Sequence, residues 1–193
     1  YRILQNGSEG YAGTEDTYIY QYAPTSNYAG SDQLRVGNKQ LYASLLRFDL
    51  SQIPPQSQVV SAAIDIYATG WSGAAVSISA YRVLRDVNHN QTTWNLAATG
   101  NPWEAPGANS VGSDRAGLAE STVNATTVLR WYSLDLTALA QQWVDGSLAN
   151  NGVLLRGGSA TSSAGFYFAS ANHGNTVLRP RMVIAFSITG SST

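Results

Sequence analysis

Cysteine is absent from this 193-residue sequence, lysine occurs once, at Lys39, and charged residues make up only 12% of the chain. Without cysteine there is no disulfide scaffold, zinc ribbon, iron–sulfur site or thiol nucleophile. Eleven basic and twelve acidic residues leave a net charge of −1, so the sequence lacks the basic excess that binds nucleic acid or an anionic membrane. No apolar run reaches the ~20 residues that a membrane-spanning helix needs.

The residues that are abundant predict a folded protein with a neutral surface. Hydrophobic residues make up 44% of the chain and aromatic residues 10%, which is enough material for a core. A surface rich in Ser, Thr, Gly and Tyr suggests an extracellular protein that makes contacts through hydrogen bonds and rings. We expect a single domain over residues 1–193, with both ends held in place and the tail at residues 190–193 touching a partner.

Short strand patterns dominate the chain. Turn clusters such as Gly37-Asn38 and Pro54-Pro55 separate nine segments with period-two alternation or short apolar runs: residues 17–22, 33–36, 42–50, 59–68, 75–84, 128–134, 152–156, 165–170 and 181–189. Residues 135–143 instead carry apolar side chains at helical spacing, with Asp135 or Thr137 as a cap and Gly146 beyond the end. The pattern predicts an all-β protein, a single jelly-roll-type antiparallel sandwich of about nine strands with one short helix.

Nothing in the sequence singles out a catalytic centre. The only histidines, His89 and His173, lie in Asn-rich turns and are most simply solvated loop residues. No G-x-S-x-G segment is present, and no spacing selects a pair of carboxylates for acid–base chemistry. We therefore predict that the protein is not an enzyme.

A structural calcium ion is the one cofactor that we consider. Calcium in β-sandwich modules is held by scattered loop oxygens, which a single sequence does not reveal. The alternative is that Glu15 and Asp16 are solvated residues at the start of a strand. The candidate ligands are Glu15, Asp16, Asp32 and Asp114.

Aromatic side chains could bind sugar, because pyranose rings stack their apolar faces on Trp and Tyr. Trp71 has glycines on both sides and is expected at an exposed hairpin tip, whereas burial is the competing expectation for each single Trp. Arg82 with Arg85, and Arg179 with Arg181, are too few to form a basic patch. The sugar-stacking candidates are Trp71, Trp94 and Trp103, the last two in the long stretch between residues 85 and 129, with Tyr28, Tyr20 and Tyr22 near the first strand.

Self-assembly is the competing hypothesis. The segment at residues 1–8 could add as a strand to a neighbouring copy through Tyr1, Ile3 and Leu4. The alternative is that this segment is the first strand of its own sandwich. Three N-x-S/T sequons are candidate glycosylation sites: Asn6, Asn90 and Asn124.

An ordered set of fragments resembles a known family. The set includes Glu15-Asp16-Thr17-Tyr18-Ile19, Leu45-Leu46-Arg47-Phe48-Asp49-Leu50 and Asn151-Gly152-Val153-Leu154-Leu155, and extends to Arg179-Pro180. In this order they resemble the DNRLRE-domain family, which overlaps with carbohydrate-binding modules of polysaccharide lyases and disaggregatases, although the name-giving string is missing here. The resemblance implies a secreted, non-catalytic β-sandwich module that binds polysaccharide or mediates surface adhesion. The alternative is a subunit of an extracellular filament or surface layer, whose partners are copies of itself.

Overall fold

The computed structural model describes residues 1–188, so the partner contact predicted for residues 190–193 lies outside the described residues. The elements are β1 (Arg2–Gln5), β2 (Thr14–Tyr20), β3 (Gln33–Gly37), β4 (Tyr42–Phe48), β5 (Gln58–Ser72), β6 (Val76–Arg82), β7 (Leu96–Ala98), β8 (Asn101–Pro102), β9 (Ser121–Ala125), β10 (Arg130–Asp135), α1 (Thr137–Val144), β11 (Val153–Gly157), β12 (Gly165–Ala169), the 3-10 turn η1 (Thr176–Leu178) and β13 (Arg181–Ser187). A strand overlaps each of the nine segments predicted from the sequence, with ends that differ by up to four residues, and the prediction of an all-β fold is confirmed.

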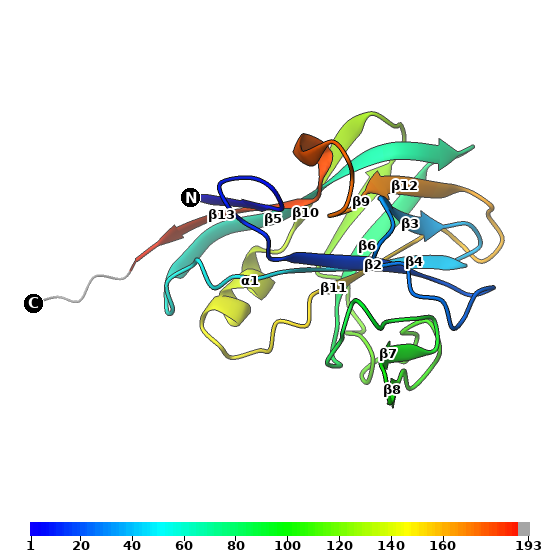
Figure 1. Cartoon of the computed structure of the whole chain (residues 1–193), viewed down its shortest axis with the longest axis horizontal. Coiled ribbons are helices and arrows are strands. Elements are labelled where there is room, and N and C mark those ends of the chain that lie inside the picture. The colour runs from blue at the N-terminus through cyan, green and yellow to red at the C-terminus, as the bar shows by residue number, and fades with distance from the viewer. Residues whose placement is uncertain (189–193) are drawn as a thin grey trace, which may run out of the picture.

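Eleven of these strands form one antiparallel sheet that curls over into two layers (Figure 1). The first layer runs β1-β13-β5-β12-β3, with β10 on the other side of β5. The second layer runs β4-β11-β6-β9, with β2 on β4. A single residue pair, Gly37 with Tyr42, joins the two layers. The two layers of the sandwich are therefore parts of one continuous hydrogen-bonded sheet.

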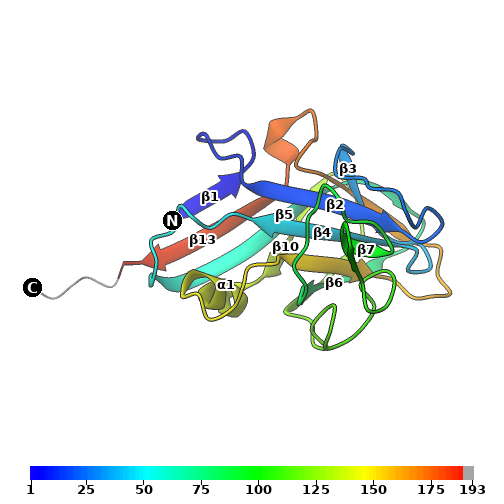
Figure 2. The same cartoon turned by 60° about the horizontal axis from the view of Figure 1, so that its bottom comes forward.

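The core lies between the layers, because alternate residues of each strand face inward. Phe166 and Phe168 of β12 are fully buried, as are Leu46 and Phe48 of β4. Helix α1 closes one end of the sandwich (Figure 2), where its Leu139 and Trp143 are buried. Asp135 accepts a hydrogen bond from the Thr137 amide at 2.8 Å, but the N-cap position is Leu136, which makes no side-chain cap hydrogen bond, so neither predicted cap residue occupies it.

The connection between β6 and β9 has a core of its own, on the outer face of the second layer. Trp94 and Trp103 pack there against Ile19, Leu45 and Leu154 of the sheet. No strand was predicted between residues 85 and 127, whereas β7 and β8 pair with each other and β9 adds to β6. This connection is consequently a third layer over part of the sheet.

Asp114 holds this connection in shape. Its fully buried carboxylate accepts hydrogen bonds from the backbone amides of Glu104 (2.8 Å), Ala105 (3.0 Å) and Ser110 (3.1 Å), and from Arg85 Nε (2.7 Å). Burial favours the neutral acid, but these donors outweigh it and hold the pKa of Asp114 below its usual value.

The N-terminal segment lies in its own sandwich. β1 pairs with β13 from Arg2 to Gln5, and Leu4 is fully buried in the main core, while Tyr1 is 82% exposed. This is the arrangement expected for a first strand that completes its own fold. Within residues 1–188, no helix is both long and apolar enough to span a membrane.

Candidate functional site

A polar groove lies on the outer face of β6 and β11, beside the third layer. Successive side chains of a strand point to opposite faces, so Ser77, Ser79 and Tyr81 of β6 share the outward face. They form the floor of the groove together with Arg156 of β11, which stands opposite Ser79. The glycine that follows Arg156 is required here, because a Cβ on Gly157 would lie 2.7 Å from the carbonyl oxygen of Ser77.

Loops form the two walls of this groove. Asn109 and Arg115 come from the connection between β6 and β9. On the other side, Gln40 of the β3–β4 turn donates to the carbonyl of Gly158 at 3.1 Å. The cavity is about 350 Å³, and the side chains that line it are hydroxyls, amides, guanidiniums and one ring, with no carboxylate among them.

Two arginines give the groove its charge. The guanidinium of Arg115 lies over the ring of Tyr81, 4.5 Å from its centroid, and the Arg115 Nε is buried without a hydrogen-bond partner. Arg156 donates to the carbonyl of Gly107 at 3.3 Å and to the side-chain oxygen of Asn109. Among residues 1–188, neither arginine forms an ion pair with a carboxylate.

The two guanidiniums also affect each other. Burial, together with the nearby charge of Arg115, lowers the pKa of Arg156 to about 10. Arg156 therefore stays protonated at neutral pH, and two uncompensated positive charges face one cavity. An anion would relieve this repulsion, and a guanidinium can bind a carboxylate through two parallel hydrogen bonds.

The predicted sugar-stacking residues lie outside this groove. Trp71 is 40% exposed, as predicted, but it lies in β5 opposite Phe166 of β12 and not at a hairpin tip, and the two ring centroids are 5.7 Å apart. Trp94 and Trp103 are only 6% and 4% exposed, and Trp103 Nε1 donates to the Thr93 carbonyl at 3.0 Å. These two rings fill the core of the third layer, so expecting them as sugar platforms was wrong. Tyr28 stacks on Tyr18 elsewhere on the molecule.

The four candidate calcium ligands do not form one cluster, and no group of three or more His, Asp or Glu side chains within residues 1–188 is placed to hold a metal. Glu15 and Asp16 are neighbours on a strand and point to opposite faces. Asp16 is buried and accepts from the Ala171 amide at 2.7 Å. Asp32 is exposed. The carboxylate oxygens of Asp114 already accept hydrogen bonds from three backbone amides and Arg85.

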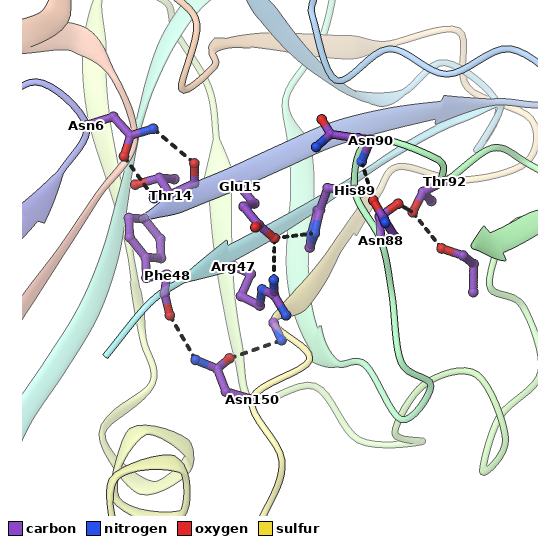
Figure 3. A network of polar contacts seen from close by, with 12 residues as sticks. Asn6, Thr14, Glu15, Arg47, Phe48, Asn88, His89, Asn90, Thr92 and Asn150 are labelled. Atoms are coloured by element: carbon purple, nitrogen blue, oxygen red, sulfur yellow. Dashed lines mark hydrogen bonds and ion pairs between the residues drawn. The ribbon is translucent and has the colours of Figure 1, made fainter. Parts of the chain in front are cut away.

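His89 is buried, with 3% of its surface exposed, and the expectation of a solvated loop residue was wrong. Figure 3 shows Glu15 between Arg47 and His89, with His89 Nδ1 3.3 Å from Glu15 Oε2. These two contacts lower the pKa of Glu15 to about 2 although partial burial acts against them. Burial lowers the pKa of His89, so the imidazole is neutral at neutral pH.

The sequons differ in accessibility. Asn90 and Asn124 are exposed. The Asn6 amide instead bonds both backbone groups of Thr14, at 2.9 and 2.8 Å, which is visible in Figure 3. A glycan on Asn6 would replace one of the two hydrogens on Nδ2, the atom that donates to the Thr14 carbonyl.

Sequence reasoning missed the two arginines of the groove. A sequence reveals pairs of bases that are close along the chain, whereas Arg115 and Arg156 lie on different elements and meet only when the third layer packs on the sheet. The signal that could have found them is compositional: nearly all the basic residues are Arg, which suits planar hydrogen bonding better than Lys does.

The sequence matches carbohydrate-binding module family 96 over residues 9–186. The chain belongs to this family. No curated protein matches the chain. The match confirms the predicted relation to carbohydrate-binding modules, and the narrower assignment to the DNRLRE-domain family stays a prediction.

Proposed function

We propose that this family 96 module is a non-catalytic domain that binds an acidic polysaccharide in the groove over β6 and β11. The observation that carries the proposal is the pair Arg115 and Arg156, which share one cavity without a carboxylate partner. Sugar hydroxyls would be recognised by the amides of Gln40 and Asn109, and a sugar ring would pack beside Tyr81.

Acidic groups on the glycan are the feature that this groove selects. A fully neutral sugar would leave the charges of Arg115 and Arg156 uncompensated, whereas a uronic acid carboxylate forms charge-assisted hydrogen bonds with them. The ring of Tyr81 supports Arg115 from below and fixes the plane in which it offers its donors.

An extracellular or cell-surface location, with a role in polysaccharide attachment or adhesion, follows as part of the proposal. It is supported by the family to which the chain belongs. The exposed sequons at Asn90 and Asn124 are compatible with passage through a secretory compartment.

Affinity electrophoresis tests the proposal. The protein is run through native gels that contain either acidic polysaccharides (polyuronates and sulfated galactans) or neutral ones. We expect retardation by an acidic polysaccharide, lost in Arg115→Gln and Arg156→Gln but kept in Arg2→Gln, a matched exposed arginine of β1. Migration unaffected by every acidic polysaccharide would refute the proposal.

Assembly through exchange of β1 is the alternative function. It requires β1 to leave its own sheet and to bury Leu4 of one copy in the core of the next. Light scattering at increasing protein concentration tests it: growth of the apparent mass that disappears when residues 1–6 are deleted would support exchange, and a constant monomer mass would exclude it.

A further inference from the structure

The polar floor of the groove continues onto β9, the last strand of the second layer. β9 pairs with β6 so that Thr122 stands opposite Ser79 and Asn124 stands opposite Ser77. Residues directly opposite each other on paired strands point to the same face, so Thr122 and Asn124 share the outward face with the two serines of the groove. Both are exposed, whereas Val123 between them packs against the main core.

A row of polar side chains crosses three strands at this place. Arg156 of β11 stands opposite Ser79 of β6, which in turn stands opposite Thr122 of β9. Neighbouring strands lie about 4.8 Å apart, so the row extends about 10 Å from its first to its last Cα atom. Ser77 and Asn124 form a second row, about 7 Å away along the strands. The polar floor therefore extends one strand beyond the cavity that contains the two arginines.

The side chains on β9 are suited to sugar hydroxyls. The hydroxyl groups of Ser79 and Thr122 are joined by a hydrogen bond of 2.8 Å. One of them donates and the other accepts, so the pair keeps one O–H donor and several lone pairs for another molecule. Asn124 adds an exposed amide that both donates and accepts. These groups fit the uncharged part of a polysaccharide, whereas the two arginines bind its acidic groups.

The walls of the groove determine where a bound chain can leave it. At one end Arg115 of the third layer covers the ring of Tyr81. Beside β11, Gln40 of the β3–β4 turn is bonded to the carbonyl of Gly158. Toward β9, by contrast, the outward residues of the strand are exposed. The open direction leads across the strands, from β11 over β6 to β9.

We infer that the bound polysaccharide runs across the strands and leaves the groove over β9, so that a glycan attached to Asn124 blocks binding. This inference rests on the proposed function of the groove. Asn124 belongs to the sequon Asn124-Ala125-Thr126, and a glycan on it projects from the face on which the polysaccharide lies. Of the two exposed sequons, only that of Asn90 can carry a glycan in the form of the protein that binds.

The absence of cysteine permits a direct test of this block. Asn124→Cys introduces the single thiol of the chain, to which a maleimide-linked polyethylene glycol is coupled in place of a glycan; mass spectrometry verifies the coupling. Asn90→Cys is the matched control, because Asn90 is also an exposed sequon residue but lines a different cavity, together with Thr14 and Asp16.

Affinity electrophoresis in gels of polyuronates and of sulfated galactans gives the readout, as retardation relative to a gel without polysaccharide. We expect Asn124→Cys to be retarded before coupling and to lose its retardation after coupling. Asn90→Cys should be retarded equally before and after coupling.

Alanine substitutions test the contacts on β9 without a label. Thr122→Ala/Asn124→Ala should raise the Kd for polygalacturonate roughly tenfold in titration calorimetry, because two hydrogen-bonding side chains are lost. The control is Ser133→Ala/Asn90→Ala, which removes an exposed hydroxyl and an exposed amide outside the groove and should leave the Kd unchanged.

The outcomes separate this inference from the proposal for the groove. Equal retardation of the two coupled variants, or equal Kd values for the two alanine double variants, would overturn the inference and leave the groove proposal standing. Loss of retardation in both coupled variants would also overturn it, because the effect would not depend on the position of the label. If no acidic polysaccharide retards the wild-type protein, the groove proposal fails and this inference fails with it.

Discussion

At the scale of single residues, the wall of the groove depends on Asp114. This carboxylate organises the segment that presents Asn109 and Arg115, through four hydrogen bonds from three amides and Arg85. Its oxygens are occupied by protein donors, which is why we assign it a structural role. Arg85 pairs with Asp114 at 2.7 Å and also with Glu104 at 3.1 Å.

Asp114→Asn should destabilise the protein by about 3 kcal/mol, because an amide cannot accept all of these donors and Arg85 loses its buried partner. Urea unfolding measures this, with the exposed Asp86→Asn as control. Since the pKa of Asp114 is lowered in the fold, the stability it contributes is present at neutral pH and is lost as the pH falls through that lowered value. Equal midpoints for both variants would contradict this role.

Asp16 should have the opposite dependence on pH. Burial raises the pKa of Asp16 to about 7, against a hydrogen bond from the Ala171 amide that lowers it. The folded state thus holds a proton that the unfolded chain releases above about pH 4, and stability falls as the pH rises toward 7.

Asp16→Asn should remove this dependence. Thermal melts at a series of pH values measure this. Relative to the wild type, the free energy of unfolding of the variant should rise by roughly 2–4 kcal/mol between about pH 5 and about pH 8. A difference between the two proteins that does not change with pH would show that Asp16 is charged throughout this range.

At the scale of elements, period-two alternation was sufficient to predict most strands. The pattern in β6 reports which residues face the core, whereas β4 is buried on both faces, and the helix at α1 followed from its apolar spacing. β7, β8 and β9 were not predicted, because two of them have two or three residues and β9 has a single apolar side chain in its centre. Their pairing depends on the neighbours that the fold supplies.

The floor of the groove is sensitive to the size of one residue. Gly157→Ala would push a methyl group against the Ser77 carbonyl, so we expect β11 and β6 to separate locally, with a stability loss of about 1–3 kcal/mol and weaker glycan binding. Melting temperature and affinity electrophoresis together measure this. Gly174→Ala is the control, because its Cβ would meet nothing within 4 Å. Equal melting temperatures and equal glycan retardation for the two variants would contradict the close contact between Gly157 and the Ser77 carbonyl.

At the scale of the whole molecule, the chain is a two-layer sandwich with a third layer on part of one face, and the groove lies where that third layer ends. The fold class could be read from the sequence, but the groove could not. It needs residues 40, 77–81, 109–115 and 156–158 to converge, and their separations in the sequence contain no sign of this. His89 was misjudged for the same reason, since the third layer buries it.

A positive groove in a molecule of net charge −1 predicts binding that depends on salt. The Kd for an acidic polysaccharide should rise several-fold between about 50 mM and about 500 mM NaCl, because added ions screen partly exposed arginines. Affinity electrophoresis at each salt concentration measures it. An affinity that does not respond to salt would indicate binding through stacking alone.

The calcium proposal is decided by a separate measurement. Thermal melts with and without a chelator compare the stability of the same protein, and a large fall in melting temperature would show that the fold holds a structural metal ion. Unchanged melting would show that the fold does not depend on calcium.

The central claim is that Arg115 and Arg156 recognise the acidic groups of a polysaccharide. Titration calorimetry with polygalacturonate and with its fully methyl-esterified form tests it most directly, because the two polymers share a backbone and differ in charge. We predict that the wild-type protein binds the acid form at least roughly tenfold more tightly, and that this preference disappears in Arg115→Gln/Arg156→Gln. Equal affinity of the wild-type protein for both polymers, or a preference that survives in the double variant, would contradict the claim.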